Sequence, residues 1–221
     1  MRFRDRRSAG LELVAELRPL LDPGDTTAMV LALPRGGVEV AASVAQALQL
    51  PLEVLVVRKL GLPEQPELAM GAIARGRVML NRDVIDAAGV TDQVIRQVIA
   101  QEQRELLRRE ALYRKGAAPL ELAQRTVILI DDGIATGSTA LSAIRGVREE
   151  VPRRLILATP VASTQALDLL QSEVDELVCL AAPEPFYSVG ASYDSFDQVS
   201  DREVTALIAA CNHNTTVGHA T

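Results

Sequence analysis

The stretch from Val127 to Ala140 reads VILIDDGIATGSTA, and its chemistry changes abruptly partway along. Four apolar residues are followed by Asp131 and Asp132, and then by glycines, threonines and a serine. An unbroken run of branched apolar side chains is typical of a strand buried on both faces of a parallel sheet. We therefore predict a strand over 126–130 that delivers two carboxylates to the edge of a sheet.

The residues after the acid pair predict an anion site. Gly133 and Gly137 permit tight turns, while Thr136, Ser138 and Thr139 supply hydroxyl groups. We expect a helix to begin at about Ser138, so that free backbone N–H groups and the positive end of the helix dipole face the loop. Such a loop suits a phosphate. The adjacent carboxylates suit ribose hydroxyls or a Mg²⁺ ion bound through its waters.

A purely structural interpretation competes with this one. Asp131 and Asp132 could simply end a strand while Thr136 and Ser138 cap the next helix, although the whole stretch makes that interpretation the weaker one. Two other phosphate sites are excluded by absent motifs. The chain has no GxxxxGK[ST] of a nucleoside triphosphatase and no GxGxxG of a dinucleotide fold.

Short apolar runs recur along the chain and alternate with helical patterns. We predict strands over 28–33, 52–57, 78–80, 126–130, 155–159 and 175–180, and helices over 37–49, 138–148 and 163–171. Alternation of this kind is the signature of a parallel sheet covered by helices. The predicted fold class is therefore α/β, with a central, mostly parallel sheet, and residues 1–211 are expected to form one domain.

Three segments stand outside this pattern. Residues 91–115 predict a long amphipathic helix, capped by Thr91 and stopped by Gly116, which is either an inserted element or an oligomer contact. Residues 181–199 predict a loop that holds four of the six aromatic residues and forms a small hood or lid. The polar residues 212–221 predict a flexible tail.

Composition narrows the range of partners and compartments. The net charge of −6 disfavours broad binding to nucleic acid or to anionic membranes. The basic N-terminus MRFRDRR is expected to be a solvated arm, and charged residues interrupt the following apolar stretch, so a signal sequence is not predicted. Two cysteines without CxxC spacing indicate neither a zinc cluster nor a disulfide framework, which favours the cytoplasm.

At this point the chain is identified by resemblance. VILIDDGIATGST resembles the signature of type I phosphoribosyltransferases, in which the loop holds the 5-phosphate of phosphoribosyl diphosphate (PRPP) and the acid pair faces the ribose. By this match Ala135, Thr136, Gly137, Ser138 and Thr139 would bind the phosphate. Asp131 and Asp132 would bind the ribose and, through water, Mg²⁺. The resemblance implies a Rossmann-like core with a small hood.

Two further matches support the resemblance. LALPRGGVEVA (31–41) resembles the family's diphosphate loop, which would place Pro34, Arg35, Gly36 and Gly37 at the diphosphate. This loop often contains a cis peptide, expected here at Leu33–Pro34 or Arg35–Gly36. Residues 57–76 resemble the stretch that leads into a mobile flap, where Arg58 and Lys59 would compensate the diphosphate charge. The alternative for these two cations is surface charge at a strand end.

The resemblance implies an enzyme that transfers the phosphoribosyl group from PRPP to a nitrogenous base or another amine. Phe186 or Tyr187 could stack on a planar acceptor, or these rings could fill a small core. Ala135 stands where 6-oxopurine members carry an aspartate, which argues against such a substrate. Family members are commonly homo-oligomers. The alternative is a non-catalytic regulator that binds PRPP or a nucleotide.

Overall fold

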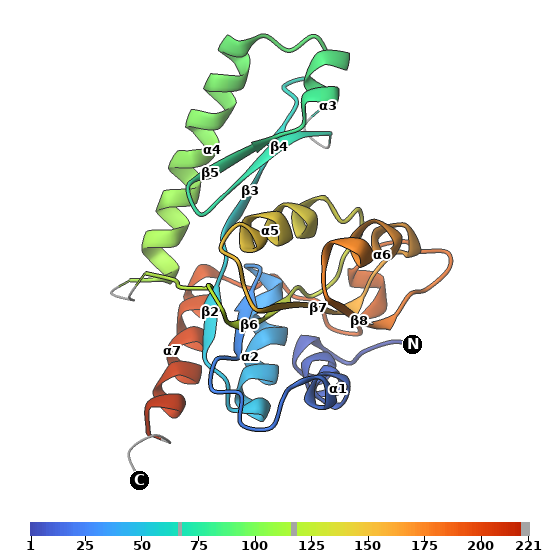
Figure 1. The fold of residues 1–221 in the computed structure, drawn as a ribbon. Helices are drawn as coiled ribbons and strands as arrows, with labels where there is room; N and C mark the ends of the chain where they lie inside the picture. The colour runs from blue at the N-terminus through green and yellow to red at the C-terminus, as the bar shows by residue number, and fades with distance from the viewer. Residues whose placement is uncertain (66–67, 116–118, 218–221) are drawn as a thin grey trace.

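The computed structural model describes residues 1–65, 68–115 and 119–217. Its centre is a sheet of five parallel strands in the order β2-β1-β6-β7-β8 (Figure 1). These strands are β1 (Met29–Ala32), β2 (Leu52–Val54), β6 (Thr126–Ile130), β7 (Arg154–Val161) and β8 (Glu176–Ala181). All residues of β1 and β6 are buried, as expected for strands covered on both faces. The predicted parallel α/β sheet is confirmed.

Helices cover both faces of this sheet. One face carries α1 (Arg6–Leu17), α2 (Gly36–Leu48) and α7 (Asp201–Val217), and the other carries α5 (Ser138–Arg148) and α6 (Thr164–Leu170) (Figure 1). The alternation of side chains along a strand explains the two layers. In β6, Ile128 and Ile130 join the core of the α2 face, whereas Val127 and Leu129 join the core beneath α5.

The strand order places a crevice between β1 and β6. From β1 the chain crosses to β2 on one side, whereas β6 leads to β7 and β8 on the other. The helices that follow β1 and β6 therefore leave toward opposite faces, so the direction of the chain connections reverses between these two strands. Ligands of open α/β sheets bind at such a switch point. The two loops are 34–37 and 131–137, which are the segments singled out in the sequence.

Residues 57–113 leave the central sheet and form an excursion above it (Figure 1). It contains an antiparallel sheet of β3 (Val57–Gly61), β4 (Ala69–Ala74) and β5 (Arg77–Leu80), followed by α3 (Arg82–Ala87) and α4 (Asp92–Tyr113). The prediction of one strand over 52–57 was wrong, because β2 ends at Val54 and Val57 begins β3. The strand predicted at 78–80 exists, but it is an edge strand of this second sheet, which is why it is only half-buried.

The long helix of the excursion confirms the helical pattern over 91–115. Thr91 accepts a hydrogen bond from the Val94 N–H at 3.5 Å and caps the helix, which ends at Tyr113. The predicted stop at Gly116, and residues 66–67 of the predicted flap, lie outside the described residues. Buried Leu106 and Ile95 pack α4 into the same core as Leu60 of β3.

Both ends of the excursion are fixed at the edge of the main body. The Tyr113 hydroxyl donates to Asp201 of α7 at 2.5 Å, and Arg114 forms an ion pair with Glu53 of β2 at 3.0 Å. The excursion also rests on α5, where a Cβ atom on Gly146 would lie 3.0 Å from the Cβ of Ala74. The second sheet is therefore held against the helix that starts at the predicted phosphate loop.

The two ends of the chain are both tied to the body. Near the N-terminus, Phe3 pairs with Tyr193, and their rings lie 5.6 Å apart. Near the C-terminus, the Asn212 side chain accepts from the Leu52 N–H at 3.1 Å and donates to the Leu52 carbonyl at 2.9 Å. These bonds satisfy polar groups of the edge strand β2 and tie Asn212 to the body, and α7 extends to Val217, within the segment 212–221 for which the sequence predicts a flexible tail. Residues 218–221 lie outside the described residues.

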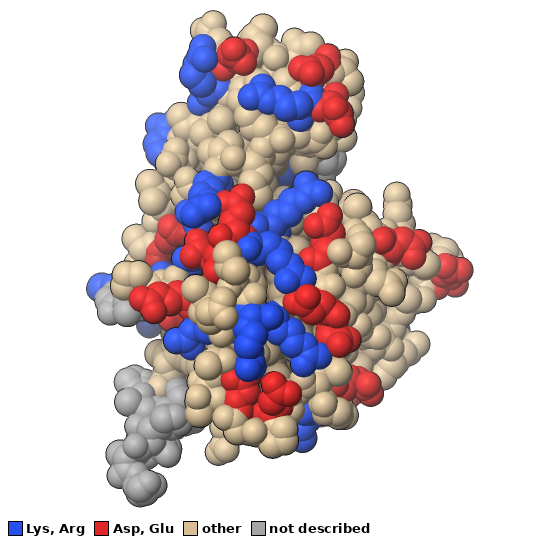
Figure 2. Space-filling view, in the orientation of Figure 1, with Lys and Arg blue, Asp and Glu red and all other residues tan. Residues whose placement is uncertain are grey.

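The visible surface carries both signs of charge. Figure 2 shows lysines and arginines interspersed with aspartates and glutamates, rather than a continuous basic face. Among the described helices, none has both the length and the apolar character needed to span a membrane.

Candidate active site

The two loops predicted to bind one ligand are in direct contact. Gly36 lies so close to Asp132 that a Cβ atom on the glycine would stand 1.8 Å from Asp132 Oδ2. Gly37 approaches the end of β6 in the same way, because its Cβ would lie 2.9 Å from the Ile130 carbonyl oxygen. Only residues without a side chain allow the backbone of 34–37 to pass this near the acid pair. The structure thus brings together these two sequence motifs.

The two aspartates occupy different environments. The Asp132 N–H donates to Asp131 Oδ1 at 2.9 Å, which orients the first carboxylate. Burial raises the pKa of Asp131 well above its usual value, and the negative charge of Asp132 raises it further. The Asp132 carboxylate instead accepts from Arg6 Nε at 2.7 Å, and its backbone carbonyl accepts from the Tyr193 hydroxyl at 2.6 Å.

The loop at 135–139, which the sequence predicts to bind a phosphate, leads into α5. Gly137 adopts φ 77°, a left-handed conformation that glycine tolerates, and it precedes α5 without a side-chain cap. The hydroxyls of Thr136 and Ser138 lie 3.3 Å apart at the protein surface, where they can reach a ligand. Ser163 donates to the Ala135 carbonyl at 2.6 Å and holds the start of the loop. The Ser138 N–H donates to Thr136 Oγ1 at 3.5 Å, so both hydroxyls lie beside the start of α5.

The three predicted cations, Arg35, Arg58 and Lys59, face different parts of the structure. Arg35 is exposed at the N-cap of α2, within the loop that touches Asp132. Arg58 lies inside β3 and forms an ion pair with Glu102 of α4 at 2.6 Å. Lys59 projects to the opposite side of β3, the side on which Val57 packs against the core beneath α5. The structure therefore directs Arg58 toward α4 and Lys59 toward the side of α5.

The cis peptide of the first loop is not at either position expected from the sequence. It joins Pro34 to Arg35, whereas Leu33–Pro34 and Arg35–Gly36 were the expected bonds. A loop of one proline and two glycines does not determine by composition which of its peptides is cis. A second cis peptide precedes Pro185.

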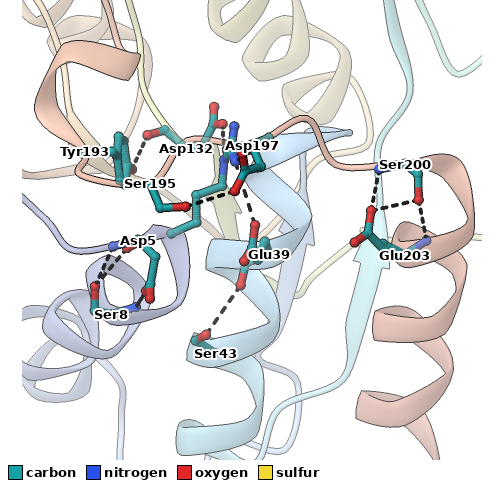
Figure 3. Close-up of polar contacts among 11 residues, drawn as sticks. Asp5, Ser8, Glu39, Ser43, Asp132, Tyr193, Ser195, Asp197, Ser200 and Glu203 are labelled. Carbon is teal, nitrogen blue, oxygen red and sulfur yellow. Dashed lines mark hydrogen bonds and ion pairs between the residues drawn. The ribbon is translucent and has the colours of Figure 1, made fainter.

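Two residues of the site were missed by sequence reasoning. Arg6 was assigned to a solvated arm, yet only 7% of its surface is exposed and it binds Asp132. Tyr193 was seen only as one aromatic of the 181–199 loop, but it fixes the Asp132 backbone (Figure 3). The available signals were the basic composition of the arm and the concentration of aromatic residues, neither of which identifies a partner.

Comparison with known proteins decides the family. A family model described as a phosphoribosyl transferase domain matches residues 17–194, which is most of the chain. The chain belongs to the phosphoribosyl transferase family. It is 42% identical over 207 residues to proteins of Mycobacterium tuberculosis named "Putative phosphoribosyl transferase", Rv0571c and MT0597. That alignment covers 93% of this chain but 46% of each relative, so the chain spans about half the length of these curated relatives.

A solved structure extends the likeness to the whole fold. The crystal structure of TT1426 from Thermus thermophilus superimposes with a TM-score of 0.83 at 40% sequence identity. The match covers 95% of this chain and 99% of that one, and therefore includes the excursion. The architecture of this phosphoribosyl transferase domain, with its long insertion, is thus shared with a solved relative.

The aromatic residues expected at an acceptor site lie in the 181–199 segment of this phosphoribosyl transferase domain. Phe186 packs beside Phe3 and Tyr193 in a small cluster, while Tyr187 is 82% exposed. The same segment contacts Gly133, whose added Cβ would meet a methyl of Val189 at 2.2 Å. Phe186 therefore has a packing role, and Tyr187 is the ring that is open to a ligand.

The family generally uses Mg²⁺ together with PRPP, and the residues present fit that ion. In the part of the chain that the structure describes, no group of three or more histidine, cysteine, aspartate or glutamate side chains could hold a metal. Asp131 and Asp132 could supply two carboxylate oxygens, which suits an ion that takes its remaining ligands from water and substrate. A cation there would also offset the burial and repulsion that raise the pKa of Asp131.

Proposed function

We propose that this domain transfers the 5-phosphoribosyl group from PRPP to a nitrogen nucleophile and releases diphosphate. The observation that carries the proposal is the contact between Gly36 and Asp132, which joins a glycine-rich anion loop to an acid pair at the switch point of the sheet. The loop that follows the acid pair leads directly into the N-terminus of α5. One ligand with a phosphate, a ribose and a diphosphate matches these three neighbouring features.

Each feature has a task that follows from its chemistry. The 5-phosphate is bound by the loop 135–139, and the ribose hydroxyls donate to Asp131 and Asp132. The diphosphate is received by the backbone of 34–37 and by Arg35, a forked donor suited to phosphate oxygens.

Two further side chains have proposed tasks at the edges of this site. Arg58 is directed toward Glu102 of α4, whereas Lys59 lies on the side of β3 that faces α5. Lys59 is therefore the better candidate for additional positive charge near the phosphate loop. Tyr187 is the candidate contact for the acceptor, because its ring is exposed on the hood.

The reaction then depends on positioning and charge. The nitrogen attacks C1 of the ribose as the bond from C1 to the diphosphate oxygen breaks, and diphosphate leaves with the electron pair. The proton of the nucleophile passes to solvent, since no side chain is assigned to it. The aspartates favour the positive charge that develops on the ribose, and Arg35 favours the departing charge. When bound, Mg²⁺ supplies further stabilisation of the leaving group.

We also propose a cytoplasmic location, supported by two cysteines that are both free thiols. The competing function is a regulator that binds PRPP or a nucleotide without turnover. The exposed hydroxyls and N–H groups at the α5 N-terminus serve either function. Release of diphosphate distinguishes them.

The test is calorimetric titration of PRPP, with and without Mg²⁺, into the wild type and an Asp131→Asn/Asp132→Asn variant. We expect binding that requires Mg²⁺ and is lost in the variant. The matched control is Asp22→Asn, a carboxylate whose side chain is 72% exposed and which pairs with Arg153. Failure of the folded wild type to bind PRPP overturns the proposal. If PRPP binds, diphosphate release in the presence of purine and pyrimidine bases or simple amines separates an enzyme from a regulator.

A further inference from the structure

Arg6 is the most deeply enclosed arginine of the N-terminal segment. Its side chain is 8% exposed, whereas that of its neighbour Arg4 is 77% exposed. It belongs to the first turn of α1, which Asp5 caps by accepting from the Ser8 N–H at 2.7 Å. Burying a guanidinium is costly unless it is paired and hydrogen-bonded, so its partners indicate what it does.

The partners of Arg6 come from three separate parts of the chain. Nε donates to Asp132 Oδ2 at 2.7 Å, and Nη1 donates to the Asp197 backbone carbonyl at 2.7 Å. The guanidinium lies 3.7 Å from the ring centroid of Phe196, and Nη1 lies 3.8 Å from Glu39 Oε2. Figure 3 shows that Asp132, Asp197 and Glu39 lie near one another, although they come from three different segments.

The surroundings of Asp132 leave it little freedom. Its side chain is 15% exposed, Arg6 holds Oδ2, and the backbone of Gly36 lies close to the same oxygen. Tyr193 holds the carbonyl of the same residue. Loss of Arg6 would leave a largely buried carboxylate without its cation, next to a second carboxylate.

We propose that Arg6 is a positioning residue for ribose recognition, acting through Asp132. By holding Oδ2, it fixes the rotamer of Asp132 so that Oδ1 is presented to a ribose hydroxyl, and it offsets one negative charge of the acid pair. The inference rests on the proposed function, because it assumes a ribose at the acid pair. It adds that the N-terminal segment is part of the binding site, although it carries none of the motif residues.

The competing interpretation is that Arg6 only fastens the N-terminus to the hood. The chain offers a matched control for that role. Arg2 forms an ion pair with Asp194 at 2.7 Å, so it joins the same two segments without touching Asp132. Arg2→Gln should weaken the fastening alone, whereas Arg6→Gln should weaken both the fastening and the ribose site.

The experiment measures PRPP affinity by calorimetry, with Mg²⁺, for the wild type and for Arg6→Gln, Arg6→Lys and Arg2→Gln. We expect about 10- to 100-fold weaker binding for Arg6→Gln, as for loss of one or two charge-assisted hydrogen bonds. Lysine keeps the charge but not the fork, so Arg6→Lys should recover part of the affinity. Arg2→Gln should bind as the wild type does.

A double-mutant cycle tests whether Arg6 acts through Asp132. Once Asp132→Asn has removed the carboxylate, Arg6→Gln should weaken PRPP binding little further. If Arg6→Gln does not fold, Arg6→Lys in the same two backgrounds completes the cycle. A second readout is the ratio of affinities for ribose 5-phosphate and 2-deoxyribose 5-phosphate, which should fall in the Arg6 variants and stay unchanged in Arg2→Gln.

The outcomes separate this inference from the function on which it rests. A wild type that does not bind PRPP refutes the proposed function and, with it, the role of Arg6. Wild-type binding together with unchanged affinity in Arg6→Gln refutes the role of Arg6 alone. If Arg6→Gln and Asp132→Asn have additive effects on PRPP affinity, or if the ratio of affinities for the two sugar phosphates is unchanged in the Arg6 variants, then Arg6 only holds the N-terminal segment in place.

Discussion

Replacing Gly36 by alanine perturbs the contact on which the proposed site depends. The new Cβ would stand 1.8 Å from Asp132 Oδ2, 2.6 Å from Asp132 Cγ and 2.9 Å from Arg6 Nε. Ordinary van der Waals contact begins at 3.4 Å, so the carboxylate and the loop must separate by roughly 1.6 Å. Gly36 has no positive φ, and alanine is the better helix former, so the α2 backbone itself accepts the change.

A displacement of this size removes Asp132 from hydrogen-bonding distance of a bound hydroxyl. Losing one charge-assisted hydrogen bond costs about 1.5–3 kcal/mol, which corresponds to PRPP binding weakened about 10- to 100-fold. Calorimetry with Mg²⁺ measures the affinity, and circular dichroism and thermal unfolding report on the fold. Ser43→Ala, on the same helix, removes only a 3.4 Å hydrogen bond to the Glu39 carbonyl and should bind normally. Wild-type affinity in a folded Gly36→Ala protein would refute the reasoning.

Three further predictions concern the stability of the fold. Gly133→Ala should lower the unfolding temperature, because the new Cβ would lie 2.2 Å from a Val189 methyl. Adding Val189→Ala should raise the unfolding temperature again. If the double variant unfolds at as low a temperature as Gly133→Ala alone, the contact is not the cause. Burial and the bond to Asp201 raise the pKa of Tyr113 to about 12, so the folded state favours the protonated phenol. Tyr113→Phe should then cost about 1 kcal/mol at pH 8, measured by urea unfolding, and the difference should shrink above about pH 10. Hydrogen bonds from Arg108 and Arg109 lower the pKa of Glu105 to about 2, so its contribution is complete above 4.5 and is lost as the pH falls toward 2. Glu105→Gln should unfold at a lower temperature than the wild type at pH 6 and at the same temperature near pH 2. If the difference in unfolding temperature between the two proteins does not change with pH, the ion pairs of Glu105 with Arg108 and Arg109 do not stabilise the fold.

The central sheet could be predicted because its strands are buried on both faces. The run at 126–130 has no polar interruption between its threonine and the acid pair, so its length and burial follow from its composition. The excursion could not be predicted as a second sheet. The strand at Val57–Gly61 contains two cations and a glycine, so it shows no continuous apolar pattern. The apolar run at 78–80 does predict a strand, but nothing in it indicates that this strand pairs within a separate sheet.

Only part of the candidate site could be predicted from the sequence, because some of its contacts join segments that are far apart in the chain. Local chemistry identifies a strand end, two glycine-containing loops and a helix start, and the structure brings Gly36 and Asp132 of two of these segments into contact. The burial of Arg6 depends on segments that are far apart in the chain. Nothing in MRFRDRR distinguishes Arg6 from the other three arginines of that segment until residues 132 and 197 are placed beside it.

The excursion leaves the body just after Glu53 and returns at Arg114, and these two residues form an ion pair at 3.0 Å. A segment whose two ends meet at one point can be lengthened, shortened or exchanged without altering the order of the strands beneath it. The domain is in this sense divided into a constant base, which carries the loops 34–37 and 135–139, and a replaceable upper part, which is the excursion. Grafting another insertion between residues 54 and 114 is therefore a practical route to altering what lies above the phosphate loop while preserving the base.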